Sequence, residues 1–367
     1  MIRSAVFMCI VLVLSACTSQ DRITTPVLPE AAGIGSTKTV FFATSRAKRS
    51  DGQFGIARSS ALRFGRADIS LPPNRDVGTI SYGFDAPDPA TDFVVSELEE
   101  YSGAARFQSS LQTQIYRQPR GAREVSVFVH GFNTSFSEAL FRLAQLQTDL
   151  QIPGASIAYA WPSRAAPLGY EYDEDSALIA RNGLEALLRD VNRTDNGGIV
   201  LVGHSMGSLV IMEALRQIER QSPGWSARNL AGVVLISPDL DIDVFMSQMA
   251  EIERIPEPFV IFTSQQDRAL GLSAFITGEE ERLGNIKDIN RLGDLPVTIL
   301  DVTALSDQRG LNHFVPGSSP ALIAMVREAR RVDPEFLAGD HRGDGRFLNA
   351  DQRFVRNATE LVVRPFR

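Results

Sequence analysis

The residue pattern most able to do chemistry in this chain is a serine flanked by glycines. Gly203, Ser205 and Gly207 form the pattern G-x-S-x-G, between the apolar run 199–202 and an apolar-striped segment that follows. A serine on a tight turn between a strand and a helix projects its hydroxyl above the edge of a sheet, where it can attack a carbonyl carbon. The pattern therefore predicts a nucleophile at Ser205.

The two glycines have a steric reason to be there. Positions two before and two after such a serine lie against neighbouring backbone, so a Cβ atom at Gly203 or Gly207 is expected to clash. The helix that starts behind Ser205 offers free N–H groups and a positive dipole end to a developing oxyanion. A purely structural turn with a serine cap can have the same residues. The presence of a candidate base, acid and oxyanion loop elsewhere in the chain is what favours the catalytic interpretation.

The motifs around Ser205 resemble those of the α/β-hydrolase superfamily, whose element order fits residues 38–330. A closer resemblance is to a bacterial family of predicted hydrolases of unassigned physiological function. The motifs that carry this resemblance are FFATSR at 41–46, HGFN at 130–133, Trp-Pro-Ser at 161–163 and GHSMG at 203–207. The resemblance ends near Val332. It implies an α/β fold with an open, doubly wound, mostly parallel sheet and helices on both faces.

A neutral serine needs an imidazole to take its proton, and the chain has four histidines. His204 adjoins the nucleophile and is expected to point away from it. His130 belongs to an earlier loop, and His341 lies beyond the last expected sheet element. His313 follows the last apolar strand pattern, where the resemblance places the general base, so it is the predicted base.

The carboxylate that orients the base has two groups of candidates. Asp267 follows the penultimate strand pattern, which matches the superfamily order Ser…Asp…His. Asp239, Asp241 and Asp243 follow the strand before it, although their spacing is more typical of a helix-capping cluster. Asp267 is the predicted acid, and the Asp239 group is the alternative.

The oxyanion hole is expected where an early strand ends in the HGFN motif. The resemblance implies that the backbone N–H groups of Phe132 and Met206 bind the developing negative charge. Gly131 gives the loop freedom to aim the Phe132 amide, and Asn133 is interpreted as a turn residue or a supporting partner.

Three aromatic residues and one acidic loop are weaker candidates. Trp161 either lines the pocket or fills the end of the sheet, and Tyr170 and Tyr172 are pocket candidates. Residues 340–351 have the length and central glycine of a calcium-binding loop, but Arg342 occupies a ligand position and a plain turn is the alternative. The sequence has no metal-binding spacing, phosphate loop or dinucleotide fingerprint, so we expect no cofactor.

From Glu124 onward the expected strands are continuous apolar runs, which are typical of a parallel sheet covered on both faces, whereas residues 45–100 are less regular. Strands are expected at 39–44, 65–71, 79–82, 125–132, 155–161, 199–204, 232–237, 258–263 and 297–302. Helices are expected at 104–116, 136–150, 173–191, 208–219, 242–252 and 321–330, with a further helical segment between 263 and 297.

The N-terminus is typical of a bacterial lipoprotein leader. Arg3 precedes a ten-residue apolar run, which at 1.5 Å per residue is too short to span a bilayer, and Leu-Ser-Ala-Cys ends it. This ending resembles a lipobox, with Cys17 as the lipidated residue, and a plain secretory signal is the alternative. We expect a leader at 1–16, a flexible tether at 17–37, a hydrolase domain at 38–331 and a polar tail at 332–367.

Composition limits the function classes. The formal net charge is −7 and no basic block is present, so nucleic acid is not an expected partner. Cys9 and Cys17 are the two cysteines, so a mature chain has none available for a disulfide. Thr18 after the cysteine implies sorting to the outer membrane, in the pattern that this leader resembles.

The sequence as a whole predicts a lipid-anchored serine hydrolase that cleaves a small or lipid-like carboxylic ester. Acyl transfer, or thioester or amide cleavage, on the same triad is one alternative, because pocket shape and not the triad selects the substrate and acceptor. A non-catalytic envelope lipoprotein that uses the fold as a scaffold is another.

Overall fold

The structure is a computed structural model, and it describes residues 22, 24–84, 86–307, 310–332, 349–355 and 358–364. Its strands are β1 (Ser36–Lys48), β2 (Phe54–Leu71), β3 (Val94–Glu100), β4 (Val125–Val129), β5 (Ala155–Tyr159), β6 (Ile199–His204), β7 (Leu230–Ile236), β8 (Phe259–Thr263), β9 (Thr298–Asp301), β10 (Asn349–Val355) and β11 (Ala358–Arg364). Its α-helices are α2 (Ala104–Tyr116), α3 (Phe136–Asp149), α4 (Tyr170–Val191), α5 (Gly207–Gln221), α6 (Trp225–Asn229), α7 (Ile242–Met249), α8 (Arg268–Thr277), α9 (Val315–Ser318) and α10 (Pro320–Val332).

All these strands belong to one sheet, in the order β10-β11-β9-β8-β7-β6-β4-β5-β1-β2-β3. The run from β11 through β9, β8, β7, β6, β4 and β5 to β1 is parallel throughout, and β2, β3 and β10 add antiparallel strands at the two sides. The carboxyl ends of the parallel strands therefore meet at one edge of the sheet, which is where open α/β sheets place their sites.

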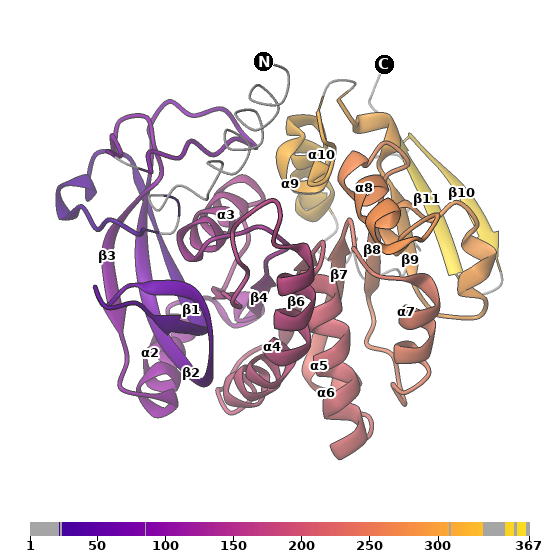
Figure 1. The fold of residues 1–367 in the computed structure, drawn as a ribbon, viewed down its shortest axis with the longest axis horizontal. Coiled ribbons are helices and arrows are strands. Elements are labelled where there is room, and N and C mark those ends of the chain that lie inside the picture. The colour runs from indigo at the N-terminus through magenta and orange to yellow at the C-terminus, as the bar shows by residue number, and fades with distance from the viewer. Residues whose placement is uncertain are drawn as a thin grey trace, which may run out of the picture.

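Helices cover both faces of the sheet (Figure 1). One face buries side chains of α2, α4, α5, α6 and α7 in a single core cluster, while α3 and α10 pack on the other face. The central strands alternate between the two clusters, for example Val127 toward the first and Phe128 toward the second. The predicted mostly parallel sheet with helices on both faces is confirmed.

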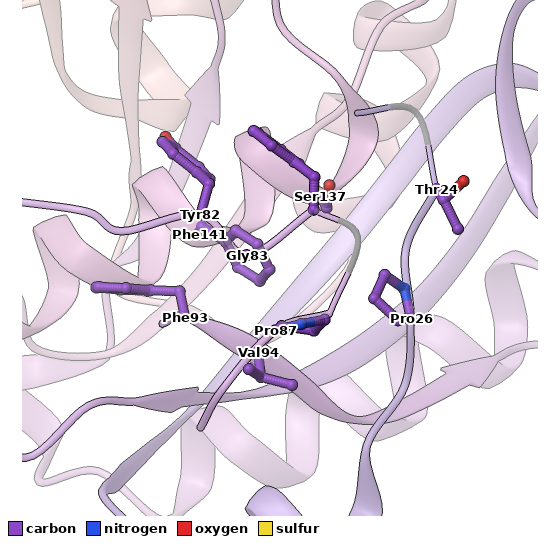
Figure 2. Close-up of a pocket in the computed structure, with 10 residues that line it drawn as sticks. Thr24, Pro26, Tyr82, Gly83, Pro87, Phe93, Val94, Ser137 and Phe141 are labelled. Atoms are coloured by element: carbon purple, nitrogen blue, oxygen red, sulfur yellow. The ribbon is translucent and has the colours of Figure 1, made fainter. Parts of the chain in front are cut away.

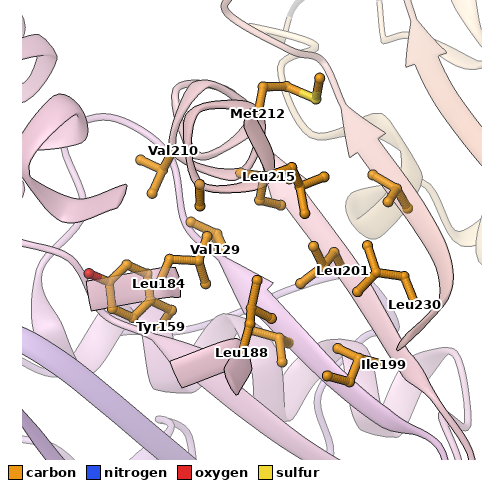
Figure 3. Packing of buried hydrophobic residues seen from close by; sticks show 14 of the residues in the cluster. Val129, Tyr159, Leu184, Leu188, Ile199, Leu201, Val210, Met212, Leu215 and Leu230 are labelled. Carbon is orange, nitrogen blue, oxygen red and sulfur yellow. The ribbon is translucent and has the colours of Figure 1, made fainter. Parts of the chain in front are cut away.

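The first cluster is the larger one and forms the floor beneath the candidate site. Figure 3 shows Leu184 and Leu188 of α4 and Leu215 of α5 packed over Leu201 of β6 and Val129 of β4. Each of these side chains has no exposed surface. Burying a large aliphatic side chain contributes about 1.5–3 kcal/mol, so this layer holds β4 and β6 firmly beside each other.

The structure corrects the sequence expectations between residues 45 and 100. The predicted strand Thr79–Tyr82 is wrong: these residues form no strand, and Ile80 and Tyr82 pack against the cluster that contains α3. Polar and apolar residues alternate over Thr79–Tyr82, and here this pattern reflects burial without a ladder partner. The first two strands are longer than predicted, and β3 was not predicted.

Parts of the expected tether and tail pack on the domain. Within 17–37, Val27 makes a bridge to Val95 of β3 and Thr25 is buried. Beyond residue 332, β11 adds to β9 with Leu361 and Val363 buried, and thereby covers an edge of the parallel sheet. Among the helices described, none is long and apolar enough to cross a bilayer.

Candidate active site

Ser205 lies on a strained turn between β6 and α5. Its φ of 54° is in the left-handed region, which is uncommon for a residue other than glycine. A Cβ atom at Gly207 would lie 2.2 Å from the Val129 carbonyl oxygen, and one at Gly203 would lie 2.9 Å from Ile211 Cδ1. The two glycines therefore let β6, β4 and α5 approach closely enough to hold Ser205 at the sheet edge.

Asp267 and His313 meet at this same edge although 46 positions separate them. His313 Nδ1 lies 2.9 Å from Asp267 Oδ2 and 3.1 Å from Oδ1. Asp267 is the N-cap of α8, where its Oδ1 accepts the Leu270 amide at 3.0 Å. The Asp267 side chain is fully buried, whereas the His313 ring is about one fifth exposed. The pairing orients the ring, and Nδ1–H donates to the carboxylate.

His204 connects the His313 loop to the serine turn. Its Nε2 lies 3.0 Å from the His313 carbonyl oxygen, to which it donates, and the two rings are 4.8 Å apart. Burial lowers the pKa of His204 well below its usual value, and the proximity of His313 adds to the effect, so the ring is neutral. His204 was expected only to point away from Ser205; the structure shows it bound to the backbone of the predicted base.

Ser205 and His313 do not hydrogen-bond to each other among the residues described. The Ser205 hydroxyl and His313 Nε2 each have no hydrogen-bond partner in that part of the chain. Contacts between a nucleophile and its base are often long in ligand-free enzymes and tighten when substrate binds. With Nδ1 committed to Asp267, the free Nε2 is the nitrogen able to accept a proton.

The alternative acids make other contacts. Asp239 Oδ1 binds Arg282 Nε at 2.8 Å and Ser273 Oγ at 2.6 Å, and both partners of this ion pair are buried. Asp241 caps α7 by accepting the Val244 amide. The third, Asp243, pairs with the exposed Arg291. The structure therefore brings His313 together with Asp267 and with none of the three alternatives.

The predicted oxyanion loop lies directly against the serine turn. A Cβ atom at Gly131 would lie 2.8 Å from Ser205 Cβ, so only glycine permits this approach. The N–H groups of Phe132 and Met206 donate no hydrogen bond within the described residues. Two unpaired amides beside a serine hydroxyl are what a negatively charged oxygen requires.

A buried polar network, which the sequence analysis missed, holds this loop. Asp173 of α4 accepts hydrogen bonds from the Asn133 amide at 3.1 Å and from Ser163 Oγ at 2.6 Å. Ser163 Oγ in turn accepts the Thr134 amide at 3.1 Å. Arg46 donates to the carbonyl oxygens of Thr134 at 2.7 Å and Ser163 at 3.0 Å. The FFATSR, HGFN and Trp-Pro-Ser motifs thus meet in one cluster.

The network holds the charged groups of Asp173 and Arg46 in the protein interior, where charges are poorly solvated. Burial raises the pKa of Asp173, while its hydrogen bonds and the nearby Arg46 oppose that shift. Burial lowers the pKa of Arg46 to about 10, so the guanidinium stays charged at neutral pH. The motif spacing contained a signal for this cluster, because all three motifs end or adjoin expected strands at the same sheet edge.

The aromatic candidates divide between core and rim. Trp161 is fully buried, stacks on His130 with ring centroids 4.9 Å apart and donates from Nε1 to the His130 carbonyl, so it fills the sheet end. Tyr170 packs its ring 5.4 Å from that of Phe132 and belongs to the rim. Tyr172 donates to the Ile56 carbonyl and packs under Arg58.

A pocket lined by Thr24, Pro26, Phe93 and Phe141 lies elsewhere (Figure 2). Neither the serine turn nor the Asp267–His313 pair contributes to its lining. Among the described residues, no group of His, Cys, Asp and Glu side chains has the arrangement of a metal site. The leader, Cys17, His341 and residues 340–348 of the acidic loop lie outside the described residues.

The chain belongs to the family described as "Alpha/beta hydrolase of unknown function (DUF900)", which it matches over residues 104–330. This finding confirms the predicted superfamily and fold class. Among solved structures, a putative YdeN-like hydrolase from Pectobacterium atrosepticum is 15% identical, with a TM-score of 0.31, over 63% of this chain and 98% of that one. A Trichoderma reesei cutinase with a phosphonate inhibitor is 13% identical, with a TM-score of 0.27, over 64% and 93%. Comparison with the curated proteins finds no match.

Proposed function

We propose that this α/β hydrolase is a lipid-anchored serine hydrolase that cleaves carboxylic esters through an acyl-enzyme. The observation that supports the proposal is that Asp267 and His313, 46 positions apart, pair with each other while His204, beside Ser205, binds the His313 carbonyl. Ser205 sits on a turn with positive φ, and His313 is hydrogen-bonded to Asp267 at the same sheet edge. A structural serine cap needs neither the strained turn nor a histidine–carboxylate pair beside it.

The chemistry follows from the free atoms at the site. Ser205 Oγ attacks the ester carbonyl carbon while His313 Nε2 takes the hydroxyl proton, and Asp267 stabilises the imidazolium. The N–H groups of Phe132 and Met206 bind the carbonyl oxygen as it becomes negative. His313 then gives its proton to the departing alcohol, which leaves an ester on Ser205. Water, activated in the same way, releases the acid and restores the serine.

The N-terminal leader supports a location in the bacterial cell envelope. A lipobox-like ending at Cys17 favours an acylated N-terminus in a bacterial cell envelope, on the periplasmic side of the outer membrane. Two or three acyl chains would hold the protein stably on a bilayer surface. Palmitate labelling that is lost in Cys17→Ser tests this part of the proposal; labelling that persists in the variant would contradict it.

A fluorophosphonate probe tests the nucleophile. We expect the folded protein to be labelled and to hydrolyse p-nitrophenyl butyrate, and Ser205→Ala to lose labelling and roughly 10³-fold or more of its activity. Ser208→Ala is the matched control, because it removes a nearby buried hydroxyl that has no hydrogen-bond partner in the described part of the chain. A folded protein that the probe does not label would favour the non-catalytic scaffold.

A further inference from the structure

Helix α8 exposes an apolar surface next to the candidate active site. Leu272, Phe275 and Ile276 are 60%, 81% and 56% exposed, and their spacing of three and four places them on one side of the helix. The opposite side of α8 buries Leu270 and Ala274 in the domain. A helix that is apolar on both sides normally has a partner on each. Here the outer side has no partner among the described residues.

Two further exposed leucines extend this surface around the site. Leu311 is 68% exposed, two residues before His313, and its carbonyl oxygen accepts the Arg268 amide at the start of α8. Leu168 is 99% exposed in the loop that follows β5. We call Leu168, Leu272, Phe275, Ile276 and Leu311 the apolar rim. All five belong to segments that follow the carboxyl ends of parallel strands, at the sheet edge that carries Ser205.

Contacts connect the parts of the rim to the oxyanion loop. Tyr170, at the start of α4, hydrogen-bonds to Ser273 of α8 at 2.8 Å and packs on Phe132. Leu168 precedes Tyr170 by two residues. Figure 1 shows α8 above β8 and β9 in the view, toward the same end of the sheet as α9 and α10. Tyr170 therefore joins helix α8 to the oxyanion loop.

The N-terminal end of the described chain lies at the same place. Arg22 donates to the Asn133 carbonyl at 2.7 Å and Asn133 Oδ1 at 2.8 Å, in the oxyanion loop. It also donates to the Ala165 carbonyl, three residues before Leu168, at 3.2 Å. Glu138 of α3 completes the attachment with an ion pair to Arg22 of 2.8 Å.

The length of chain before Arg22 sets how far away a lipid anchor can be. Cys17 precedes Arg22 by five residues, which span at most about 18 Å when fully extended. A diacylated Cys17 would therefore hold Arg22, which is bound to the oxyanion loop, within about 18 Å of the lipid headgroups. The rim is followed by exposed Glu279 and Glu280, and the chain is acidic overall, so contact with lipid has to be apolar in origin.

We propose that the apolar rim docks on the lipid bilayer and presents Ser205 to ester substrates carried in that bilayer. The proposal rests on the function proposed above and narrows its substrate class from carboxylic esters in general to esters carried in a bilayer. Leu272, Phe275 and Ile276 insert among the headgroups, which holds the sheet edge that carries Ser205 at the bilayer surface.

Vesicle binding tests the docking separately from catalysis. The probe is zwitterionic phosphatidylcholine vesicles, and the protein is the full mature chain with Cys17→Ser, so that lipidation does not mask the rim. We expect sedimentation with vesicles that persists at high salt, and a loss of about tenfold or more in the partition coefficient when Leu272, Phe275 and Ile276 are all changed to Ser. The matched control is Leu178→Ser with Ile179→Ser, a pair 45% and 44% exposed in the middle of α4.

Two activity measurements complete the test. The α8 variant should keep its rate on soluble p-nitrophenyl butyrate and lose most of its rate on a phospholipid ester embedded in vesicles. Ser205→Ala should lose both rates and still bind vesicles. The vesicle-binding result can therefore be interpreted even if Ser205 is not the nucleophile. Vesicle binding that is unchanged in the α8 variant overturns the proposal. So does a change from dimer to monomer in that variant, which would assign the rim to a second copy of the chain.

Discussion

Replacing Asp267 by asparagine separates its role at His313 from its role in the fold. The side chain accepts the Leu270 amide as the N-cap of α8, and asparagine caps helices about as well as aspartate. The helix should therefore form as before. What changes is the group that faces His313 Nδ1, which becomes a neutral amide in place of a carboxylate.

The expected loss can be worked out from the geometry. An imidazolium and a carboxylate whose nitrogen and oxygen lie 2.9 Å apart attract each other by about 6 kcal/mol at an effective dielectric constant of about 20. At about 1.4 kcal/mol per factor of ten, this attraction corresponds to about 10⁴ in rate. The His313 ring is partly exposed, and water reduces the effect, so we expect a loss between about 10³ and 10⁴.

The assay is kcat/KM on p-nitrophenyl butyrate, with thermal unfolding as the check on folding. Asp241→Asn is the matched control, because Asp241 caps α7 in the same way, with the Val244 amide at 2.9 Å, and makes no contact with His313. The control should keep its activity. If Asp267→Asn retains more than about a tenth of its activity, the reasoning from the Asp267–His313 pair is refuted.

Two further predictions concern the oxyanion loop and the pH dependence of stability. Gly131→Ala should lower kcat on p-nitrophenyl butyrate by about 10²-fold or more, because the new Cβ displaces the loop from Ser205. Gly121→Ala is the control, since its added Cβ meets nothing within 4 Å, and it should have no effect. Equal rates for the two variants would contradict the prediction. Burial lowers the pKa of His130 to about 3, and the nearby Arg46 adds to the shift, so the unfolded chain takes up this proton first as the pH falls. The neutral His130 ring therefore costs the fold no stability above about pH 6.5. As the pH falls from there toward 3, the fold becomes progressively less stable, because only the unfolded chain binds the proton. His130 should therefore contribute about 2 kcal/mol to the fall in the free energy of unfolding, measured in urea, between pH 7 and pH 5. Buried His204 adds to the same fall, and His130→Gln should remove only the His130 part.

Most of the fold was predictable because its signals are local. The buried parallel strands are continuous apolar runs, and capping residues such as Ser135, which accepts the Glu138 amide, mark where helices begin. The region between residues 45 and 100 was less predictable. Residues 79–82 alternate like a strand, but their burial comes from packing on α3, and burial without pairing has the same sequence pattern as burial within a ladder.

The sequence by itself determined which residue types were available for the chemistry: one serine in a glycine-flanked turn, few histidines and a choice of aspartates after the right strands. Only the tertiary structure decided that Asp267 faces His313, while Asp239 is bound to Arg282. It also showed that Arg46 and Asp173 hold the oxyanion loop, that His204 binds the His313 backbone, and that α8 is apolar on its outer side. The physical reason is that these contacts join residues far apart in sequence, and their distances depend on how loops from different strands pack at one sheet edge.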